Sequence, residues 1–266
     1  MTELNAIAKA LKKALLQVGA YQVAEQKKLS SLEVQVKGLN QLVSDVDVNS
    51  EKMLVEACTL ALPEASFITE EGTVGQNKNA EYYWIIDPLD GTTNYLHGLA
   101  IYSISVALFH QGEPLLAWVY CPSMNQMFEA QKGHGAFLNE RQIHVSQASE
   151  LKDSLLATGF PYYKFDEMPE YLSLLEELMK STHGLRRMGS AAIDLAYVAW
   201  GKFEGFFELN LSPWDVAAGV LLVTEAGGTM CDFKGGQDFV FGNSIVASNG
   251  KIDQEFKNKI NQSFSV

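Results

Sequence analysis

The sequence predicts an α+β half over residues 1–145 and an α/β half over residues 146–266. In the first half, helical segments precede apolar runs of alternating polarity that are joined by glycine-containing turns. In the second half, strand-like runs alternate with helical segments, which is typical of an α/β unit. No linker of low complexity separates the halves. We therefore expect them to pack tightly, with a site between them.

The first half is expected to begin with two helices. Apolar residues recur at helical spacing from Ile7 to Val18, which predicts an amphipathic helix. Polar Ser50 and Glu51 are expected to open a second helix that runs to Leu60. An antiparallel meander packed against these helices should follow, with strands at Tyr82–Ile86, Ile101–Phe109, Pro114–Tyr120 and Gln126–Ala130.

The second half changes rhythm after Val145, where strands and helices begin to alternate. The expected strands are Leu155–Thr158, Phe203–Glu208 and Ile245–Ser248, and the expected helices are Glu167–Ser181, Ser190–Trp200, Trp214–Ala226 and Asp253–Gln262.

Composition excludes several classes of protein. With 266 residues, 47% of them hydrophobic, the chain can bury a large core. A net charge of −12 argues against direct binding of nucleic acid, which favours basic surfaces. Charged residues interrupt the N-terminal apolar positions, and no run has the length of a membrane span. Three widely separated cysteines suggest buried reduced thiols. We therefore expect a cytoplasmic protein without a membrane partner.

The segment Asp87–Tyr95 is the most informative part of the sequence. Asp87 and Asp90 flank a Pro-Leu pair where an apolar strand is expected to end, and Gly91 permits a close backbone approach. Two carboxylates on a stiff turn can share a hard cation such as Mg²⁺ or Ca²⁺. The following Thr-Thr-Asn suits a helix start, whose N–H groups attract anions. A cation beside an anion site suggests phosphoryl transfer.

Acids from three other segments could join this turn. Glu70 follows a strand-like run and could complete a cation site, although a solvated loop is the plainer interpretation. Asp45 and Asp47 alternate along a segment expected to be extended, or they cap the following helix. Asp215 stands in the first turn of an apolar helix, where the helix dipole alone would favour an acid.

The segment Arg186–Ala192 and Glu208 are candidates for substrate binding. Two arginines before a Gly-Ser helix start can bind an anion. Alternatively, Arg187 pairs with an acid and Ser190 is only a cap. Glu208 ends an aromatic-rich strand and could bind polyol hydroxyls, or it could be a surface carboxylate.

Two long motifs carry a family resemblance. DPLDGTTNYLHG at Asp87–Gly98 and WDVAAGVLLVTEAGG at Trp214–Gly228 resemble motifs of the inositol monophosphatase family, which is Mg²⁺-dependent and lithium-sensitive. Asp47, Glu70 and the Gly189–Ala192 run lie in the expected order. The likeness covers essentially the whole chain. It implies a layered α/β/α/β/α sandwich of the inositol monophosphatase and fructose-1,6-bisphosphatase type.

The resemblance also implies a role for each matching residue. The implied ligands of two to three Mg²⁺ ions per subunit are Glu70, Asp87, Asp90, Asp215 and the carbonyl of Leu89. Glu70 and Thr92, the latter oriented by Asp47, are implied to activate water. The implied substrate-binding residues are Leu89, Asp90, Gly91, Thr92, Arg186, Gly189, Ser190, Ala191, Glu208 and Asp215. Lys37 matches a family lysine near the cleft.

The resemblance implies in-line hydrolysis of a small phosphate monoester by metal-activated water. It also implies that the protein is a homodimer. Thr93-Asn94 favours inositol phosphate over adenosine bisphosphate, whose phosphatases tend to have Lys-Glu there. Fructose bisphosphate, histidinol phosphate and adenosine bisphosphate stay open as substrates. A partner-binding regulator of transcription machinery is the alternative from another class. A catalytically dead homologue would be expected to lack a carboxylate, and none is lost.

Overall fold

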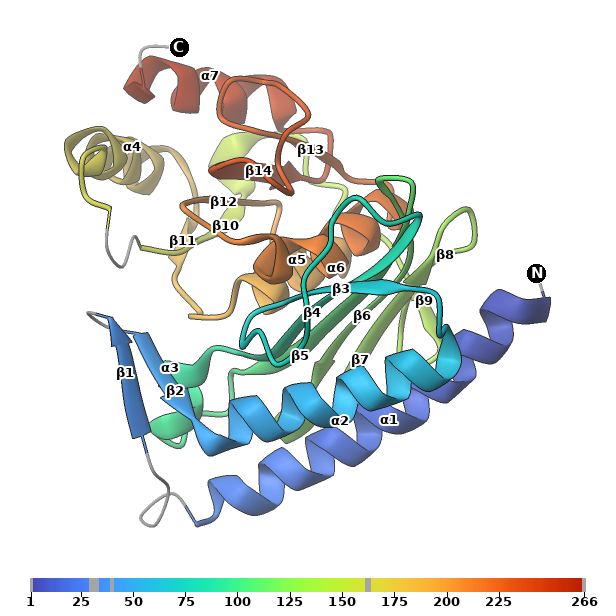
Figure 1. The fold of residues 1–266 in the computed structure, drawn as a ribbon. Helices are drawn as coiled ribbons and strands as arrows, with labels where there is room; N and C mark the ends of the chain where they lie inside the picture. The colour runs from blue at the N-terminus through green and yellow to red at the C-terminus, as the bar shows by residue number, and fades with distance from the viewer. Residues whose placement is uncertain (1, 29–33, 39–40, 161–163, 265–266) are drawn as a thin grey trace.

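The computed structural model describes residues 2–28, 34–38, 41–160 and 164–264, with side chains over 4–28, 45–160 and 164–264. The elements form a sandwich of alternating helical and sheet layers (Figure 1). From one side to the other, the helical layers are α1 (Thr2–Gln26) with α2 (Asp45–Ala61), α5 (Ala191–Ala199) with α6 (Pro213–Glu225), and α4 (Met168–Ser181) with α7 (Asp253–Phe264). This confirms the layered α/β/α/β/α architecture.

The first sheet has seven strands in sequence order, antiparallel except for the parallel first pair. The strands are β3 (Ser66–Thr69), β4 (Tyr82–Asp90), β5 (Ser103–His110), β6 (Glu113–Cys121), β7 (Gln126–Gln131), β8 (Gly135–Leu138) and β9 (Arg141–Ile143). The predicted meander is confirmed. Alternate residues of β4 pack on opposite sides: Trp84 toward α1 and α2, Ile85 toward α5 and α6. Both faces of this sheet are therefore buried.

The second sheet has five strands in the order β11-β10-β12-β14-β13. Its strands are β10 (Leu155–Thr158), β11 (Gly184–Arg186), β12 (Gly205–Leu209), β13 (Thr229–Cys231) and β14 (Ser244–Ser248). β10 lies parallel to β11 and β12, whereas β14 is antiparallel to its two neighbours. Phe206 faces α5 and α6, and the next residue, Phe207, faces α4 and α7.

The two sheets meet at one shared helical layer. The first sheet ends at Ile143 and the second begins at Leu155, on either side of the expected boundary near Val145. Helix α6 belongs to the second half of the chain, yet it packs against β4, β5 and β6 of the first sheet. We therefore keep the division at residue 145 as a proposal about sequence halves, because one core joins them.

The second helix corrects an expectation. α2 begins at Asp45, so Asp45 and Asp47 lie in its first turn and not in an extended segment. Acids are favourable there because the helix dipole is positive at its N-terminus. Ser50 and Glu51, expected to open the helix, are fully buried in its second turn. The same helix therefore turns a polar face inward, beside its apolar residues.

The remaining strands and smaller features complete the description. β1 (Val34–Gly38) and β2 (Gln41–Ser44) form an antiparallel hairpin, and α3 (Thr92–Leu96) follows β4. Cys58, Cys121 and Cys231 are free and buried, as predicted. Within the described ranges, no helix is both long and apolar enough to cross a bilayer.

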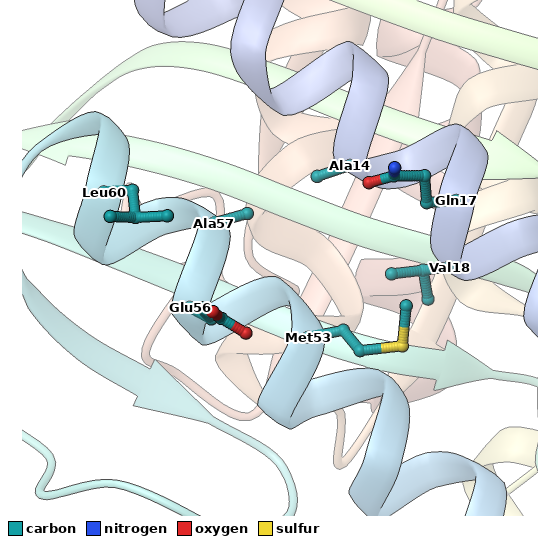
Figure 2. Close-up of a pocket in the computed structure, with 7 residues that line it drawn as sticks. All are labelled: Ala14, Gln17, Val18, Met53, Glu56, Ala57 and Leu60. Atoms are coloured by element: carbon teal, nitrogen blue, oxygen red, sulfur yellow. The ribbon is translucent and has the colours of Figure 1, made fainter.

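A shallow hollow of about 270 Å³ lies between α1 and α2. Figure 2 shows side chains of both helices around it, and the lining residues are Ala14, Gln17, Val18, Met53, Glu56, Ala57 and Leu60. It contains none of the predicted site residues, so the candidate active site lies elsewhere.

Candidate active site

Three carboxylates meet where β4 ends and α6 begins. Asp87, Asp90 and Asp215 each offer an oxygen, and these oxygens lie within 4.8 Å of one another. The pairing of β4 with β5 shifts register between Asp87 and Asp90, so the Pro-Leu pair bulges and both acids reach the same side. The backbone N–H of Leu89 donates to Oδ1 of Asp87 over 2.9 Å and fixes this bulge.

Asp215 reaches the cluster from a helix terminus. It is the third residue of α6, and its Oδ2 accepts a hydrogen bond of 2.6 Å from the backbone N–H of Ser212. One oxygen of Asp215 therefore acts at the helix terminus, as the plainer interpretation of the sequence predicted. Because α6 packs against β4 and β5, the same helix start also brings Asp215 to the β4 acids.

Glu70 lies beside Asp87 but is not one of the three acids whose oxygens meet. It follows β3, and its backbone N–H donates to the carbonyl of Ile86 over 3.2 Å, which extends the parallel β3–β4 pairing toward Asp87. Its carboxyl group lies close enough to Asp87 to raise the pKa of that acid, after the larger effect of burial. The alternative of a solvated loop without contacts does not hold for this side chain.

The acids repel one another's negative charge. Removal from water raises the pKa of Asp87 well above its ordinary value, and the charges of Glu70, Asp90 and Asp215 raise it further. Burial raises the pKa of Asp90 to about 6, against the lowering effect of Ser190 and backbone N–H groups. Burial and Asp90 likewise raise the pKa of Asp215. Such an all-oxygen, mutually repelling set fits a hard divalent cation, which would favour the ionised carboxylates.

Asp47 and Thr92 lie next to this cluster. The Thr92 hydroxyl donates to the carbonyl of Leu89 over 3.0 Å, and it lies 3.3 Å from Oδ1 of buried Asp47. Thr92 starts α3 directly after Gly91, whose φ of 92° lies in the left-handed region. A Cβ on Gly91 would lie 3.1 Å from the carbonyl oxygens of Gly189 and Ile101. Only glycine therefore lets the end of β4 approach these segments without strain.

The start of α5 holds Asp90. The Ser190 hydroxyl donates to Oδ2 of Asp90 over 2.6 Å, and the backbone N–H of Ala192 donates to the same oxygen over 2.8 Å. Ser190 also accepts from the backbone N–H of Ile193, so it caps the helix as the sequence alternative suggested. Ser190, Gly189 and Ala191 therefore lie beside the acid cluster.

A second buried polar group surrounds Glu208 in β12. Glu208 is 6% exposed, so it is not a surface carboxylate, and a Cβ on Gly159 would collide with it. Burial raises the pKa of Glu208 to about 8, and the positive charge of Arg187 acts in the opposite direction. Asp194 of α5 is 1% exposed, and burial followed by the charge of Glu208 raises its pKa.

Asp194 was not among the predicted site residues, and Arg187 was predicted only as part of the candidate anion-binding segment Arg186–Ala192. Asp194 is the one charged residue of the apolar segment Ala191–Ala199, and that isolation was the available signal. Arg187 lowers the pKa of Asp90, Asp194 and Glu208, as the alternative of pairing with an acid suggested. Arg186 is exposed and its Nη1 donates to the carbonyl of Leu185 over 3.0 Å, so its substrate role stays a prediction. The Lys37 side chain lies outside the described residues.

Comparison with known proteins finds one family over nearly the whole chain. The inositol monophosphatase family model matches residues 2–265. A Rhizobium meliloti protein named inositol-1-monophosphatase is 39% identical over 256 residues, which is 96% of each chain. An Escherichia coli protein named Nus factor SuhB is 40% identical over 222 residues, covering 84% of this chain and 83% of the relative. The crystal structure of the extragenic suppressor protein suhB from Bartonella henselae superposes with a TM-score of 0.92 at 36% identity, covering 97% of this chain and 99% of the other.

Proposed function

Because the chain belongs to the inositol monophosphatase family, we propose that it hydrolyses a small phosphate monoester with Mg²⁺, most readily myo-inositol monophosphate. The observation that carries the proposal is the meeting of Asp87, Asp90 and Asp215, with Glu70 close to Asp87. We further propose a cytoplasmic homodimer, by analogy with the family.

The acid cluster would hold the cations. Asp87, Asp90, Asp215 and the Leu89 carbonyl are the proposed ligands, and Glu70 adds a carboxylate for two to three Mg²⁺ ions in all. When bound, these cations would supply positive charge to the phosphate oxygens and to the attacking and leaving oxygens. This charge also offsets the repulsion between a phosphate and a protein of net charge −12.

Glu70 and Thr92 would orient the attacking water. When Thr92 donates its single hydroxyl hydrogen to Asp47, its oxygen can accept a hydrogen from water. The Glu70 carboxylate can accept the other water hydrogen. Asp47 therefore acts through Thr92, by fixing the direction of that hydroxyl. Two fixed acceptors would direct the water lone pair at phosphorus in line.

The substrate would lie between the two polar groups. We assign the phosphate to the backbone N–H groups of Gly91 and Thr92. The polyol would lie against Glu208 and the start of α5, at Gly189, Ser190 and Ala191. Arg186 is kept as a proposed substrate contact at the edge. Glu208 can accept hydrogen bonds from hydroxyl groups, which favours a polyol over an apolar leaving group.

A phosphatase screen tests this proposal. Purified protein would be assayed with and without Mg²⁺ on myo-inositol monophosphate, fructose bisphosphate, histidinol phosphate and adenosine bisphosphate. We expect Mg²⁺-dependent release of phosphate with the highest kcat/KM on inositol monophosphate. A higher kcat/KM on another ester of the panel would make that ester the proposed substrate in place of inositol monophosphate. If no ester released phosphate in a Mg²⁺-dependent way, the proposed reaction would be refuted.

A second candidate function comes from the name of a relative. The Escherichia coli protein that is 40% identical is named a Nus factor. This favours a role for the present chain as a partner-binding regulator of transcription machinery. Retention of purified RNA polymerase by both the wild-type protein and Asp90→Asn would support that role independently of catalysis. Absence of retention by either protein would count against it.

A further inference from the structure

Glu51 is a fully buried carboxylate that contacts one short segment of chain. It lies in the second turn of α2 and is 0% exposed. Its Oε1 accepts from the Thr69 hydroxyl at 3.0 Å and from both the backbone N–H and the hydroxyl of Thr73 at 2.7 Å. Its Oε2 accepts from the backbone N–H of Glu71 at 2.7 Å. All four donors come from residues 69–73.

This segment carries Glu70 at its centre. Glu51 holds the residues on both sides of Glu70, Thr69 and Glu71. The N–H of Glu70 itself is fixed by the Ile86 carbonyl of β4. The backbone on which the Glu70 side chain stands is therefore fixed from three directions. Its carboxyl group reaches Asp87 from that fixed position.

The inner face of α2 supports other parts of the site in the same way. Asp47 lies one turn before Glu51, on the same face of the helix, and contacts Thr92. Ser50 is also 0% exposed and accepts from the Gln22 side-chain amide at 3.2 Å. The same Gln22 nitrogen donates to the carbonyl of Pro88 over 2.7 Å, within the β4 bulge between Asp87 and Asp90. Three inward polar residues of α2 therefore lead to three separate parts of the site.

Glu51 is suited to this task because it only accepts. A carboxylate can take hydrogen bonds on both oxygens at once, whereas a glutamine amide would point hydrogens at one set of these donors. Four charge-assisted hydrogen bonds compensate a buried carboxylate for lost water and hold the loop more rigidly than neutral bonds. A buried donor left without its acceptor costs free energy, so the loop would move until that donor found a new acceptor.

We propose that Glu51 is a positioning residue for Glu70. By holding the backbone on both sides of Glu70, Glu51 sets the affinity for the cation that Glu70 binds, and it does so without touching the substrate. The proposal rests on the proposed function, because it assumes that Glu70 is a cation ligand. Loss of a residue that orients a metal ligand typically weakens metal binding or activity by about 10- to 100-fold.

The test compares Glu51→Gln with Glu56→Gln, an exposed glutamate of the same helix. We expect Glu51→Gln to raise the Mg²⁺ concentration for half-maximal activity by about tenfold or more. Its kcat should fall, with KM for substrate at saturating Mg²⁺ within about twofold of wild type, since the loop does not face the polyol. Glu56→Gln should match the wild type.

Mn²⁺ binding measured by electron paramagnetic resonance gives a readout that does not need activity. The Glu51→Gln protein should lose affinity at one class of site, while the sites of Asp87, Asp90 and Asp215 keep theirs. Unchanged Mn²⁺ affinity, with only a lower melting temperature, would show a purely structural residue and overturn the proposal. If the wild type proves inactive on phosphate esters, this comparison still decides the role of Glu51.

Thr73→Val is a milder variant that tests the proposal if Glu51→Gln does not fold. It removes one of the four hydrogen bonds, that of the Thr73 hydroxyl, and leaves the backbone N–H donor in place. We expect a smaller loss of Mn²⁺ affinity in the same direction, about twofold to tenfold, in a folded protein. Wild-type Mn²⁺ affinity in Thr73→Val together with an unfolded Glu51→Gln would contradict the proposal.

Discussion

The acids that support Glu70 and Thr92 and the acids around Glu208 are held differently. In the first half, Glu51 accepts four hydrogen bonds, and Asp47 lies against the Thr92 hydroxyl. In the second half, Oδ1 of Asp194 is among the buried oxygens that have no hydrogen-bond partner in the described part of the chain. The positive charge of Arg187 lowers the pKa of both Asp194 and Glu208, yet burial still raises the pKa of Glu208 to about 8.

This difference separates two tasks. A frame of short hydrogen bonds holds reacting groups in one geometry, which serves the orientation of water and cations. Buried polar groups that are incompletely paired cost free energy, and a ligand with hydroxyl groups can repay that cost on binding. We therefore expect substitutions in the first half to act on kcat and cation affinity. Substitutions around Glu208 should act on KM and on the pH dependence.

The largest expected effect is that of Asp90→Asn. The variant keeps the shape of the side chain but removes one charge from the cation cluster, so kcat should fall on the order of 10³-fold or more. Steady-state kinetics and circular dichroism check the loss and the fold. Near-wild-type turnover by a folded Asp90→Asn protein would sink the assignment of the cluster.

Thr92→Val is expected to have the next largest effect. Valine has nearly the same shape but lacks the hydroxyl that lies between Asp47 and the Leu89 carbonyl. We expect kcat to fall about 10²-fold, the usual scale for loss of a group that handles a proton or orients water. The Mg²⁺ half-saturation should not change. A shift of Mg²⁺ affinity with unchanged kcat would show that Thr92 supports the cations and not the water.

Glu208→Gln should have a smaller effect of a different kind. At pH 9, above the pKa of about 8 that burial gives Glu208, loss of the carboxylate weakens charge-assisted hydrogen bonds to polyol hydroxyls, so KM for inositol monophosphate should rise about tenfold. The kcat should stay within a few-fold of wild type, and smaller esters without those hydroxyls should be less affected. Kinetics on both kinds of ester provide the measurement. A fall in kcat with unchanged KM would show that Glu208 acts on turnover, as the first-half residues are expected to, and not on substrate binding.

The smallest expected effect concerns stability and pH. The folded-state pKa of Glu208 is raised from 4.5 to about 8, so the folded protein retains a proton that the unfolded chain releases. The free energy of unfolding should therefore fall as pH rises from about 4.5 to 8, and then level off. Each kcal/mol corresponds to about 2–4 °C in melting temperature for a chain of this size.

Melting curves without divalent cations, recorded from pH 5 to 9, check this sign. The slope should be smaller in Glu208→Gln than in the wild type, because the variant removes one titrating group. The acids of the cation cluster contribute in the same direction, so some slope should persist. Identical slopes in the two proteins would mean that Glu208 does not titrate in this range.

Local signals in the sequence were sufficient for much of the fold. The period-two and helical patterns predicted the meander and the alternating second half, because each pattern reflects which residues of one element face a core. The acids of Asp87–Asp90 and the isolated acid of the α6 start predicted the members of the acid cluster, although Pro88 and Leu89 form a bulge within β4 and not the expected turn after it. Both features depend on residues that are adjacent in the sequence, so the sequence alone was enough to predict them.

Only the tertiary structure decided how the pieces support one another. Sequence showed Glu51 as a polar residue near a helix start, and the packing of α2 against β4 placed it beneath residues 69–73. Asp194 and Arg187 likewise gain their electrostatic roles from segments distant in sequence. Whether a polar side chain meets water or a partner depends on which element covers it, and that is fixed by long-range packing. The sequence by itself therefore determined which acids are proposed as reacting groups, and the tertiary structure decided what holds them in place.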